Sequence, residues 1–551
     1  MKYPAIPSAQ SLILILKKSG IRSIIISPGS RNAPLTLGFN LDPFFTTYSV
    51  VDERCAAFFG LGMAQQSHAP VALVCTSGSA LLNYYPAVAE AFYQQVPLIV
   101  ISADRPLSKI DIGDGQTIRQ RNVFENHSLY NANLEENDTI NNHHEIFNAV
   151  NQSIQKKGPV HINIPFEEPL YELTNQPTSS VVINEIKPVF LPLEIADVER
   201  LIWKNASKKM VLVGDMPPNA LSQEVIDFFA NEPSLLVMTE STSNLHQESF
   251  LNKIDVIITP FSNEDFENFK PDLLITIGGM LVSKRIKSFL RKYQPLHHWH
   301  IDPLRAYDTF GCLTQHFKSK PESFFKEILN LKSVPYNYKK QFLDIKKNRD
   351  QSHQTFLANA PYSDLKVFEI LLNKIPEAYD LQISNSSSIR YTQLFDLKPN
   401  QAVYCNRGTS GIDGSTSTAI GAAVGSKKPT LLITGDLSFF YDSNALWNNY
   451  IPQNFKIIVI NNSGGGIFRI LPGHQESPLF SKFFETVHEL TAEHLAKMYS
   501  FQYFKANDVE QLRLNLDQFL LANTPSILEI FTPTTVNDHV LKDYFRFLSQ
   551  H

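Results

Sequence analysis

Short apolar runs alternate with longer segments of helical period along most of the chain. In the first third, the runs SIIISPGS, VALVCTSGSA, PLIVISADRP and GPVHINIP are rich in β-branched residues and end in small or polar ones. The segment VDERCAAFFGLGMAQQ has the composition of a buried helix. Strand runs that alternate with helical segments are typical of βαβ units around a parallel sheet. The pattern therefore predicts an α/β fold.

The order of these elements is repeated near the other end of the chain. LQISNSSS, GTSGIDGSTSTAIGAAVG, PTLLITGDLSFFYDSNALW, FKIIVINNSGGG and PSILEIFTP match the first set in order, with few identical residues. Another alternation, KKMVLVGDMPP, SLLVMTES, PDLLITIGGMLVSKRI and LHHWHIDP, lies between the two sets. Two similar sheets would leave a cleft between like surfaces, within one chain or across a dimer. We expect three doubly wound parallel-sheet domains, at residues 1–175, 190–332 and 360–551.

Two polar stretches separate these expected domains. ELTNQPTSSVV precedes the middle domain and NYKKQFLDIKKNRDQSHQ follows it. Both lack strand signals, so we expect linker or surface helix there.

The composition narrows the class of protein. A chain of 551 residues is too long for one core, and a net charge of -5 with 19% charged residues gives no basic field for nucleic acid or an anionic membrane. The four cysteines are far apart, so neither a disulfide framework nor a structural zinc site is indicated. No apolar run approaches the length of a membrane span, and we see no export signal. We expect a cytoplasmic enzyme that acts on small molecules.

Two neighbouring strand runs of the last third end in polar residues. PTLLITGD ends in Gly435-Asp436, and FKIIVINN ends in Asn461-Asn462 before a glycine run. Ligands of open α/β sheets bind at the carboxyl ends of the strands. A carboxylate, an amide oxygen and a backbone carbonyl suffice for Mg²⁺ that also binds phosphate, and glycines let backbone approach the anion. Alternatively, Asp436 caps the following helix and the Asn-Ser-Gly run is only a turn.

Glu53 opens a helix whose other residues are nearly all apolar or small. Such a helix is buried, so its carboxylate should be shielded from water and its proton affinity raised. A group of this kind can give and take protons. The alternative is a first-turn acid favoured by the helix dipole, with Asp52 as the cap.

Together these motifs resemble those of the thiamine diphosphate enzymes. The resemblance implies pyrimidine-binding, middle and diphosphate-binding domains, with the cofactor held between subunits of a homodimer or a dimer of dimers. Glu53 would hydrogen-bond the aminopyrimidine and start deprotonation of the thiazolium carbon. Ile412 would wedge the cofactor into its bent shape. Mg²⁺ or Mn²⁺ would be bound by Asp436, Asn462 and Gly464. The other cofactor contacts would be Gly435, Leu437, Ser438, Gly465 and Ile467.

Within that group, ISPGSRNAPL, ISADRP, GDGQTIRQ, VSKRI, NSSSIR and NRGTSGIDGSTST look most like the 2-succinyl-5-enolpyruvyl-6-hydroxy-3-cyclohexene-1-carboxylate synthases of menaquinone biosynthesis. These enzymes release CO2 from 2-oxoglutarate and add the remaining four-carbon unit to isochorismate in a Stetter-like 1,4-addition. Both substrates carry two carboxylates, which guanidinium groups bind well. The resemblance implies catalytic roles for Glu53, Gln116, Arg31, Arg390 and Arg407. It implies substrate contacts at Ser30, Arg31, Arg105, Gln116, Lys284, Ser386, Arg390, Arg407, Ile467 and Phe468.

Two departures and several alternatives accompany this interpretation. Many members of the group carry Asn where this chain has Gly115, and a third Asn where it has Ser463. Arg105 could instead form a loop ion pair and Lys284 could be solvated. Another thiamine-dependent 2-oxo acid decarboxylase or carboligase is the second hypothesis. A non-catalytic nucleotide-binding protein is the third, although Gly60-Leu61-Gly62 begins no complete GxGxxG motif.

Overall fold

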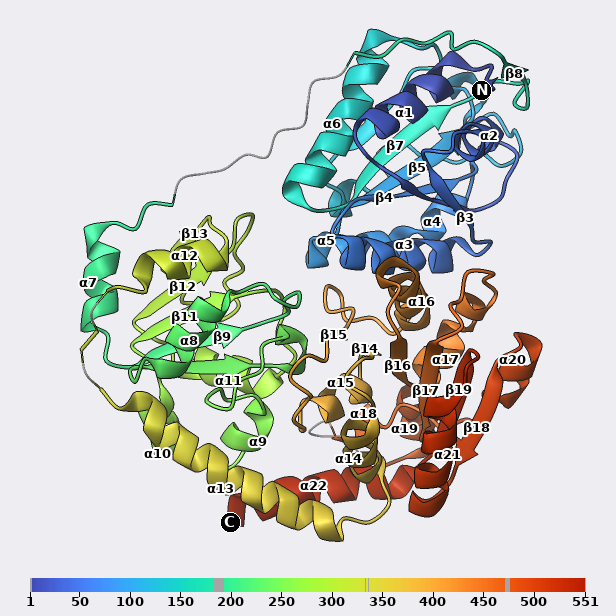
Figure 1. Ribbon diagram of the computed structural model, residues 1–551. Helices are drawn as coiled ribbons and strands as arrows, with labels where there is room; N and C mark the ends of the chain where they lie inside the picture. The colour runs from blue at the N-terminus through green and yellow to red at the C-terminus, as the bar shows by residue number, and fades with distance from the viewer. Residues whose placement is uncertain (1, 183–192, 332, 335, 471–475, 551) are drawn as a thin grey trace.

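The computed structural model describes residues 2–182, 193–331, 333–334, 336–470 and 476–550. Within these ranges, three parallel sheets covered by helices form three α/β units (Figure 1). This confirms the predicted fold class. The division at 1–175, 190–332 and 360–551 stays a prediction, and its boundary residues 1, 190, 332 and 551 lie outside the described ranges.

The first and third sheets have the same topology. The first has the order β3-β2-β4-β5-β7-β6 and the third the order β15-β14-β16-β17-β19-β18, so the strands of each sheet follow the same sequence in space. The first sheet contains β2 (Ser23–Ile26), β3 (Thr46–Ser49), β4 (Val71–Cys75), β5 (Leu98–Asp104), β6 (Asn131–Asn133) and β7 (Val160–Pro165). The third contains β14 (Asp380–Ile383), β15 (Val403–Tyr404), β16 (Thr430–Gly435), β17 (Phe455–Asn461), β18 (Gln502–Ala506) and β19 (Ser526–Phe531). The predicted repeat is therefore confirmed.

The middle sheet has the order β10-β9-β11-β12-β13. It contains β9 (Lys209–Val213), β10 (Leu235–Thr239), β11 (Leu273–Ile277), β12 (His297–Ile301) and β13 (Gln315–Phe317). Helix α13 (Tyr338–Asn359) follows it and packs along α22 (Thr534–Gln550) at the bottom of Figure 1. The second polar stretch is thus a helix, as one of the two predicted options allowed. The first polar stretch contains β8 (Leu173–Thr174), which pairs with β1 (Tyr3–Pro4), so the expectation of no strand there was wrong.

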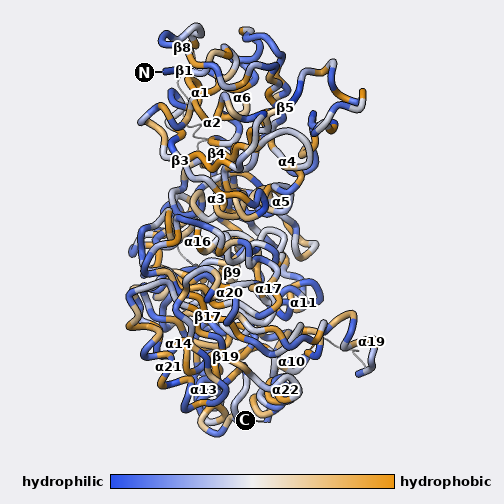
Figure 2. Tube along the Cα trace, turned by 90° about the vertical axis from the view of Figure 1, so that its right-hand side faces the viewer, coloured by the Kyte–Doolittle hydropathy of each residue, from blue (hydrophilic) through white to orange (hydrophobic). Residues whose placement is uncertain are grey.

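Two helices join the first and third units directly. Helix α3 (Glu53–Ser67) packs against α16 (Ser415–Ser426), and the two lie next to each other in both Figure 1 and Figure 2. A Cβ atom on Gly62 would lie 2.0 Å from the Thr418 carbonyl oxygen, and one on Gly421 would lie 2.0 Å from that of Phe59. Only glycine permits this backbone approach. One apolar core therefore continues from the first sheet into the third.

Among the described residues, no helix combines the length and apolar composition needed to cross a bilayer.

Candidate active site

A cavity of about 490 Å³ lies at the carboxyl ends of β14, β16 and β17, next to the middle unit. Of the residues predicted for the cofactor and the metal, all but Glu53 line it: Ile412, Gly435, Asp436, Leu437, Ser438, Asn462, Gly464, Gly465 and Ile467. The residues predicted for substrate that line it are Lys284, Ser386, Arg390, Arg407, Ile467 and Phe468. The cavity thus gathers side chains from the two strand tips and from the middle unit.

Asp436 is the first residue of α17 (Asp436–Tyr441), with Gly435 at the N-cap position and no side-chain cap. Its Oδ1 accepts a hydrogen bond from the Leu437 N–H at 2.6 Å, and its Oδ2 accepts one from the Gly464 N–H at 2.9 Å. The alternative that Asp436 caps this helix was therefore wrong. The carboxylate instead connects the tips of β16 and β17.

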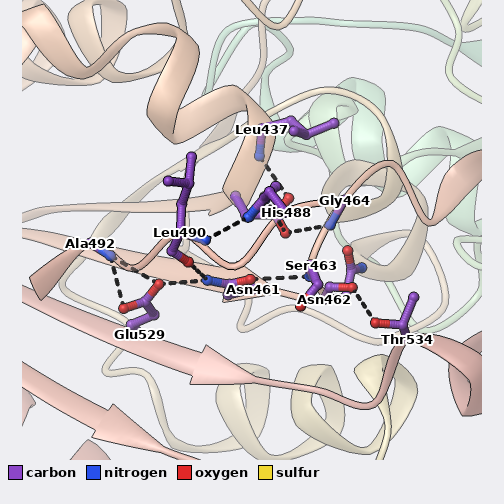
Figure 3. A network of polar contacts seen from close by, with 12 residues as sticks. Leu437, Asn461, Asn462, Ser463, Gly464, His488, Leu490, Ala492, Glu529 and Thr534 are labelled. Carbon is purple, nitrogen blue, oxygen red and sulfur yellow. Dashed lines mark hydrogen bonds and ion pairs between the residues drawn. The ribbon is translucent and has the colours of Figure 1, made fainter. Parts of the chain in front are cut away.

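The two asparagines after β17 have different partners. Asn461 Nδ2 donates to Glu529 Oε1 at 2.7 Å and to the Leu490 carbonyl at 2.9 Å, which fixes the strand end (Figure 3). Asn462 Nδ2 donates to Asp364 Oδ2 at 3.1 Å. Asn462 Oδ1 is buried and has no hydrogen-bond partner in the part of the chain that the structure describes. A buried amide oxygen without a donor suits a cation.

Gly464 has a φ of +147°, and a Cβ atom there would lie 2.5 Å from the Glu485 carbonyl oxygen. The same carbonyl accepts a hydrogen bond from the Gly465 N–H at 2.6 Å. The Glu485 carboxylate is buried and forms an ion pair with Arg469 of α18 (Ile467–Ile470). The glycine run is therefore held in place by a segment twenty residues further along the chain.

Sequence reasoning missed two ionisable groups at the strand tips. His488 Nε2 lies 3.3 Å from Asp436 Oδ2, and its Nδ1 accepts from the Leu490 N–H at 3.1 Å. Asp364, at the start of α14 (Asp364–Lys374), lies beside Asn462, and burial raises its pKa to about 6. Neither residue belongs to a motif near Asp436 in the sequence, so no local signal indicated them. Among the described residues, no group of three or more His, Cys, Asp or Glu is arranged for a metal.

Four cationic side chains line the same cavity. Arg390 lies on α15 (Ser387–Thr392) and Arg407 follows β15, while Lys284 and Lys287 lie on α11 (Lys284–Lys292) of the middle unit. Arg407 Nη1 donates to Asn385 Oδ1 at 2.7 Å. Lys287 was not predicted. The cavity therefore suits an anionic ligand.

Ser386 precedes α15 and lines the cavity with an unusual backbone conformation. Its φ is +71° and its ψ is -125°, a region that residues with a Cβ atom rarely adopt. Such strain is typically found at functional sites.

The residues predicted in the first unit do not line this cavity. Glu53 is half-buried at the start of α3, and burial raises its pKa, as the sequence predicted. Asp52 Oδ1 accepts from the Cys55 N–H at 3.1 Å, so Asp52 is the helix cap that the alternative expected. Glu53 can therefore have a raised pKa while the neighbouring Asp52 caps the helix.

Ser30 and Arg31 follow β2, Arg105 follows β5, and Gln116 lies in the next loop, where it is exposed. Arg31 is buried and donates to the Phe166 carbonyl at 3.0 Å and to Glu168 Oε1 at 3.1 Å. Arg105 Nη1 lies 3.4 Å from Asp114 Oδ2, which is the loop ion pair that the alternative described. These side chains belong to the carboxyl edge of the first sheet, not the third.

Comparison with known proteins agrees with this arrangement. Residues 8–130 match the thiamine pyrophosphate enzyme N-terminal TPP binding domain, and residues 386–530 match the C-terminal TPP binding domain. Both matches indicate thiamine diphosphate as the cofactor. They also favour an enzyme over the non-catalytic nucleotide-binding protein of the third hypothesis.

Three full-length relatives carry the name 2-succinyl-5-enolpyruvyl-6-hydroxy-3-cyclohexene-1-carboxylate synthase. The one from Flavobacterium psychrophilum is 61% identical over 550 residues, and the one from Flavobacterium johnsoniae is 58% identical over 555 residues; each match covers 100% of both chains. The one from Porphyromonas gingivalis is 38% identical over 572 residues, covering 98% of this chain and 96% of its own. The chain therefore belongs to the 2-succinyl-5-enolpyruvyl-6-hydroxy-3-cyclohexene-1-carboxylate synthase family of thiamine diphosphate enzymes.

Proposed function

We propose that this protein releases CO2 from 2-oxoglutarate and adds the remaining four-carbon unit to isochorismate, as a cytoplasmic enzyme of menaquinone biosynthesis. The observation that carries the proposal is the group of cations, Arg390, Arg407 and Lys284, beside the Asp436 and Asn462 strand tips in one cavity. Both substrates are dicarboxylates, and guanidinium groups bind carboxylates through two parallel hydrogen bonds. Thiamine diphosphate supplies the nucleophilic carbon that this chemistry requires.

We propose Asp436, Asn462 and the Gly464 carbonyl as the ligands of Mg²⁺ or Mn²⁺ bound with the diphosphate. The buried Oδ1 of Asn462 has no hydrogen-bond partner among the described residues, which supports this assignment because a cation would satisfy it. The strand-end glycines leave room for the phosphate oxygens.

Several other predicted residues also have a task in this proposal. Glu53, with its raised pKa, would hold the proton that it could exchange with the cofactor's aminopyrimidine when thiamine diphosphate is bound. Arg390 and Arg407 orient the substrate carboxylates, while Ile467 and Phe468 form an apolar wall that excludes water. The first-unit residues Ser30, Arg31, Arg105 and Gln116 complete the substrate site.

Such a site needs a second copy of the chain, because Glu53 lies outside the cavity that its own Asp436 lines. We therefore propose a homodimer or a dimer of dimers, in which the partner's first sheet closes the cavity. Large apolar side chains are exposed just before α3, at one further position of the first unit, and at and after the end of α17, which supports an interface there. They are Val51, Leu82, Tyr441 and Trp447.

The test is CO2 release from 2-oxoglutarate by the purified protein with thiamine diphosphate and Mg²⁺, with and without isochorismate. Fast release that consumes isochorismate is expected. Release that ignores isochorismate, or equal turnover of pyruvate, would instead favour another thiamine-dependent decarboxylase or carboligase. No release from any 2-oxo acid would contradict the proposed function.

A further inference from the structure

One cation of the cavity, Lys287, belongs to none of the motifs that indicated the family. It lies one helical turn after Lys284 on α11, so both side chains are on the same face of that helix. Lys284 is exposed, whereas Lys287 is partly buried. Arg285, between them, stacks on the Phe545 ring at 4.9 Å and does not line the cavity. Lys287 is therefore the more enclosed of the two lysines that α11 contributes to the cavity.

Lys287 and Arg407 converge on one carbonyl oxygen. Lys287 Nζ donates to the Leu281 carbonyl at 3.1 Å, and Arg407 Nη2 donates to the same oxygen at 3.3 Å. A shared acceptor brings the two positive charges close together although they come from different units of the fold. Their mutual repulsion is unfavourable unless an anion lies between them.

Three buried carboxyl groups act on this pair, Glu240, Asp215 and Glu90, but none of them forms an ion pair with it among the described residues. Glu240 accepts hydrogen bonds from the Val282 and Ser283 N–H groups, both at 2.7 Å. Burial raises the pKa of Glu240 to about 7. Burial, with the neighbouring arginines, also lowers the pKa of Lys287, although Glu240 acts in the opposite direction. In the described ranges, no ion pair involves Lys287, Arg390 or Arg407.

Unused donors also remain on the two arginines. The Nε atoms of Arg390 and Arg407 are buried and have no hydrogen-bond partner in the part of the chain that the structure describes. Buried cationic donors without an acceptor are costly, so a ligand that supplies acceptor oxygens would be favoured here. A carboxylate has the charge and the oxygens to meet both needs.

We propose that Lys287 and Arg407 together clamp a carboxylate of the acidic substrate, which makes Lys287 a specificity-determining residue. This inference rests on the proposed function and adds a residue to it. The carboxylate comes from either the 2-oxo acid or its acceptor, since both are dicarboxylates, and the experiment below separates the two.

The test compares Lys287→Met with Lys292→Met in the enzyme loaded with thiamine diphosphate and Mg²⁺. Lys292 is on the same helix, but its Nζ lies 3.3 Å from Asn263 Oδ1 and it does not line the cavity. Calorimetry measures the Kd for glutarate, an unreactive dicarboxylate of the length of 2-oxoglutarate. Steady-state assays measure KM for each substrate, and thiamine diphosphate affinity is measured separately.

For Lys287→Met we expect either the glutarate Kd and the 2-oxoglutarate KM, or the isochorismate KM alone, to rise by about tenfold or more. The first pattern assigns the carboxylate to the 2-oxo acid and the second to its acceptor. Lys287→Arg, which keeps the charge, should recover part of the loss. Cofactor affinity should match that of Lys292→Met.

Equal constants for the two methionine variants would overturn the clamp, and so would a loss confined to thiamine diphosphate affinity. If Lys287→Met does not fold, the glutarate Kd and the substrate KM values of Lys287→Arg and Lys287→Gln test the clamp instead. A wild-type protein that neither binds glutarate nor turns over the two substrates would overturn the proposed function itself. A fully active wild type with unaffected Lys287 variants would overturn the clamp alone.

Discussion

Asp436 shows how one carboxylate can hold two strand tips together. Because it connects β16 to Gly464 of the glycine run, Asp436→Ala should weaken Mg²⁺ and thiamine diphosphate binding together, by about tenfold or more. Calorimetric titration with each ligand is the measurement. The control is Asp543→Ala, since Asp543 is exposed and, among the residues that the structure describes, pairs only with Arg546 on α22. Normal affinity for both ligands in Asp436→Ala would place the metal elsewhere.

The carboxyl group of Glu53 can be tested without changing its size. Glu53→Gln should keep the fold and the cofactor affinity but lower kcat by about 10²- to 10⁴-fold, because only the proton exchange is removed. Stopped-flow or steady-state kinetics and a cofactor titration on the same preparation separate the two effects. An unchanged kcat would refute the assigned role.

Sequence reasoning found the site residues that lie in contiguous motifs and missed those brought in by packing. Ile412, Asp436 and Asn462 lie in motifs that can be recognised from neighbouring residues. Asp364 and His488 reach the site only through the way distant segments pack, whereas Lys287 directly follows a recognised motif. The separation of Glu53 from the cavity of its own chain likewise depends on how the units are placed, which no local pattern encodes.

At the scale of elements, the predicted strands are the ones with mostly buried residues, including β10 at an edge of the middle sheet. Of the strands left out of the prediction, β3, β6, β13, β15 and β18 lie at the edges of the three parallel sheets, and β1 and β8 form a separate two-stranded sheet. They are short or partly exposed, as in the NAN of β6 and the VY of β15, so they lack the continuous apolar runs of strands covered on both faces. Buried strands therefore have apolar runs that can be recognised in the sequence, whereas the short or exposed strands do not.

The crossing of α3 and α16 predicts a sharp sensitivity to side-chain size. Gly421→Ala would place a methyl group 2.0 Å from the Phe59 carbonyl oxygen, so the helices must separate. We expect a loss of about 2 kcal/mol or more in the free energy of unfolding, measured by denaturant titration. Gly115→Ala is the control, because a Cβ atom there meets nothing within 4 Å. Equal stability of the two variants would contradict the close crossing.

The same helices enclose a carboxyl group whose ionisation should affect stability. Asp442 is fully buried after α17, accepts bonds from Ser417 of α16 and Cys55 of α3, and has a pKa raised to about 7 by burial. A carboxyl group with a folded pKa above its unfolded value binds more protons when folded, so it stabilises the fold at low pH and loses this effect as pH rises toward 7.

Wild-type protein should therefore exceed Asp442→Asn in unfolding free energy by more at pH 5 than at pH 8. Denaturant titrations at both pH values, at one protein concentration, measure this difference. A difference that is constant with pH, or larger at pH 8, would contradict the raised pKa.

At the scale of the whole molecule, the proposed dimer can be tested by mixing inactive variants. If Glu53 of one copy serves the cavity lined by Asp436 of the other, a mixed dimer of Glu53→Gln and Asp436→Ala chains contains one intact site. Unfolding and refolding equal amounts together should restore about a quarter of wild-type activity, because half of the dimers are mixed and each has one of two sites. No recovery would mean that each chain supplies both residues of its own site.

The backbone of Ser386 has a consequence for the history and engineering of this protein. Its left-handed conformation in the cavity costs about 1–3 kcal/mol for a residue with a Cβ atom, and glycine would largely avoid that cost. Selection for thermal resistance alone should thus favour Ser386→Gly, whereas selection for turnover should keep the hydroxyl. Variants evolved only for heat tolerance would then accumulate this exchange and bind their substrates less well. A single residue would thus set a balance between thermal stability and activity.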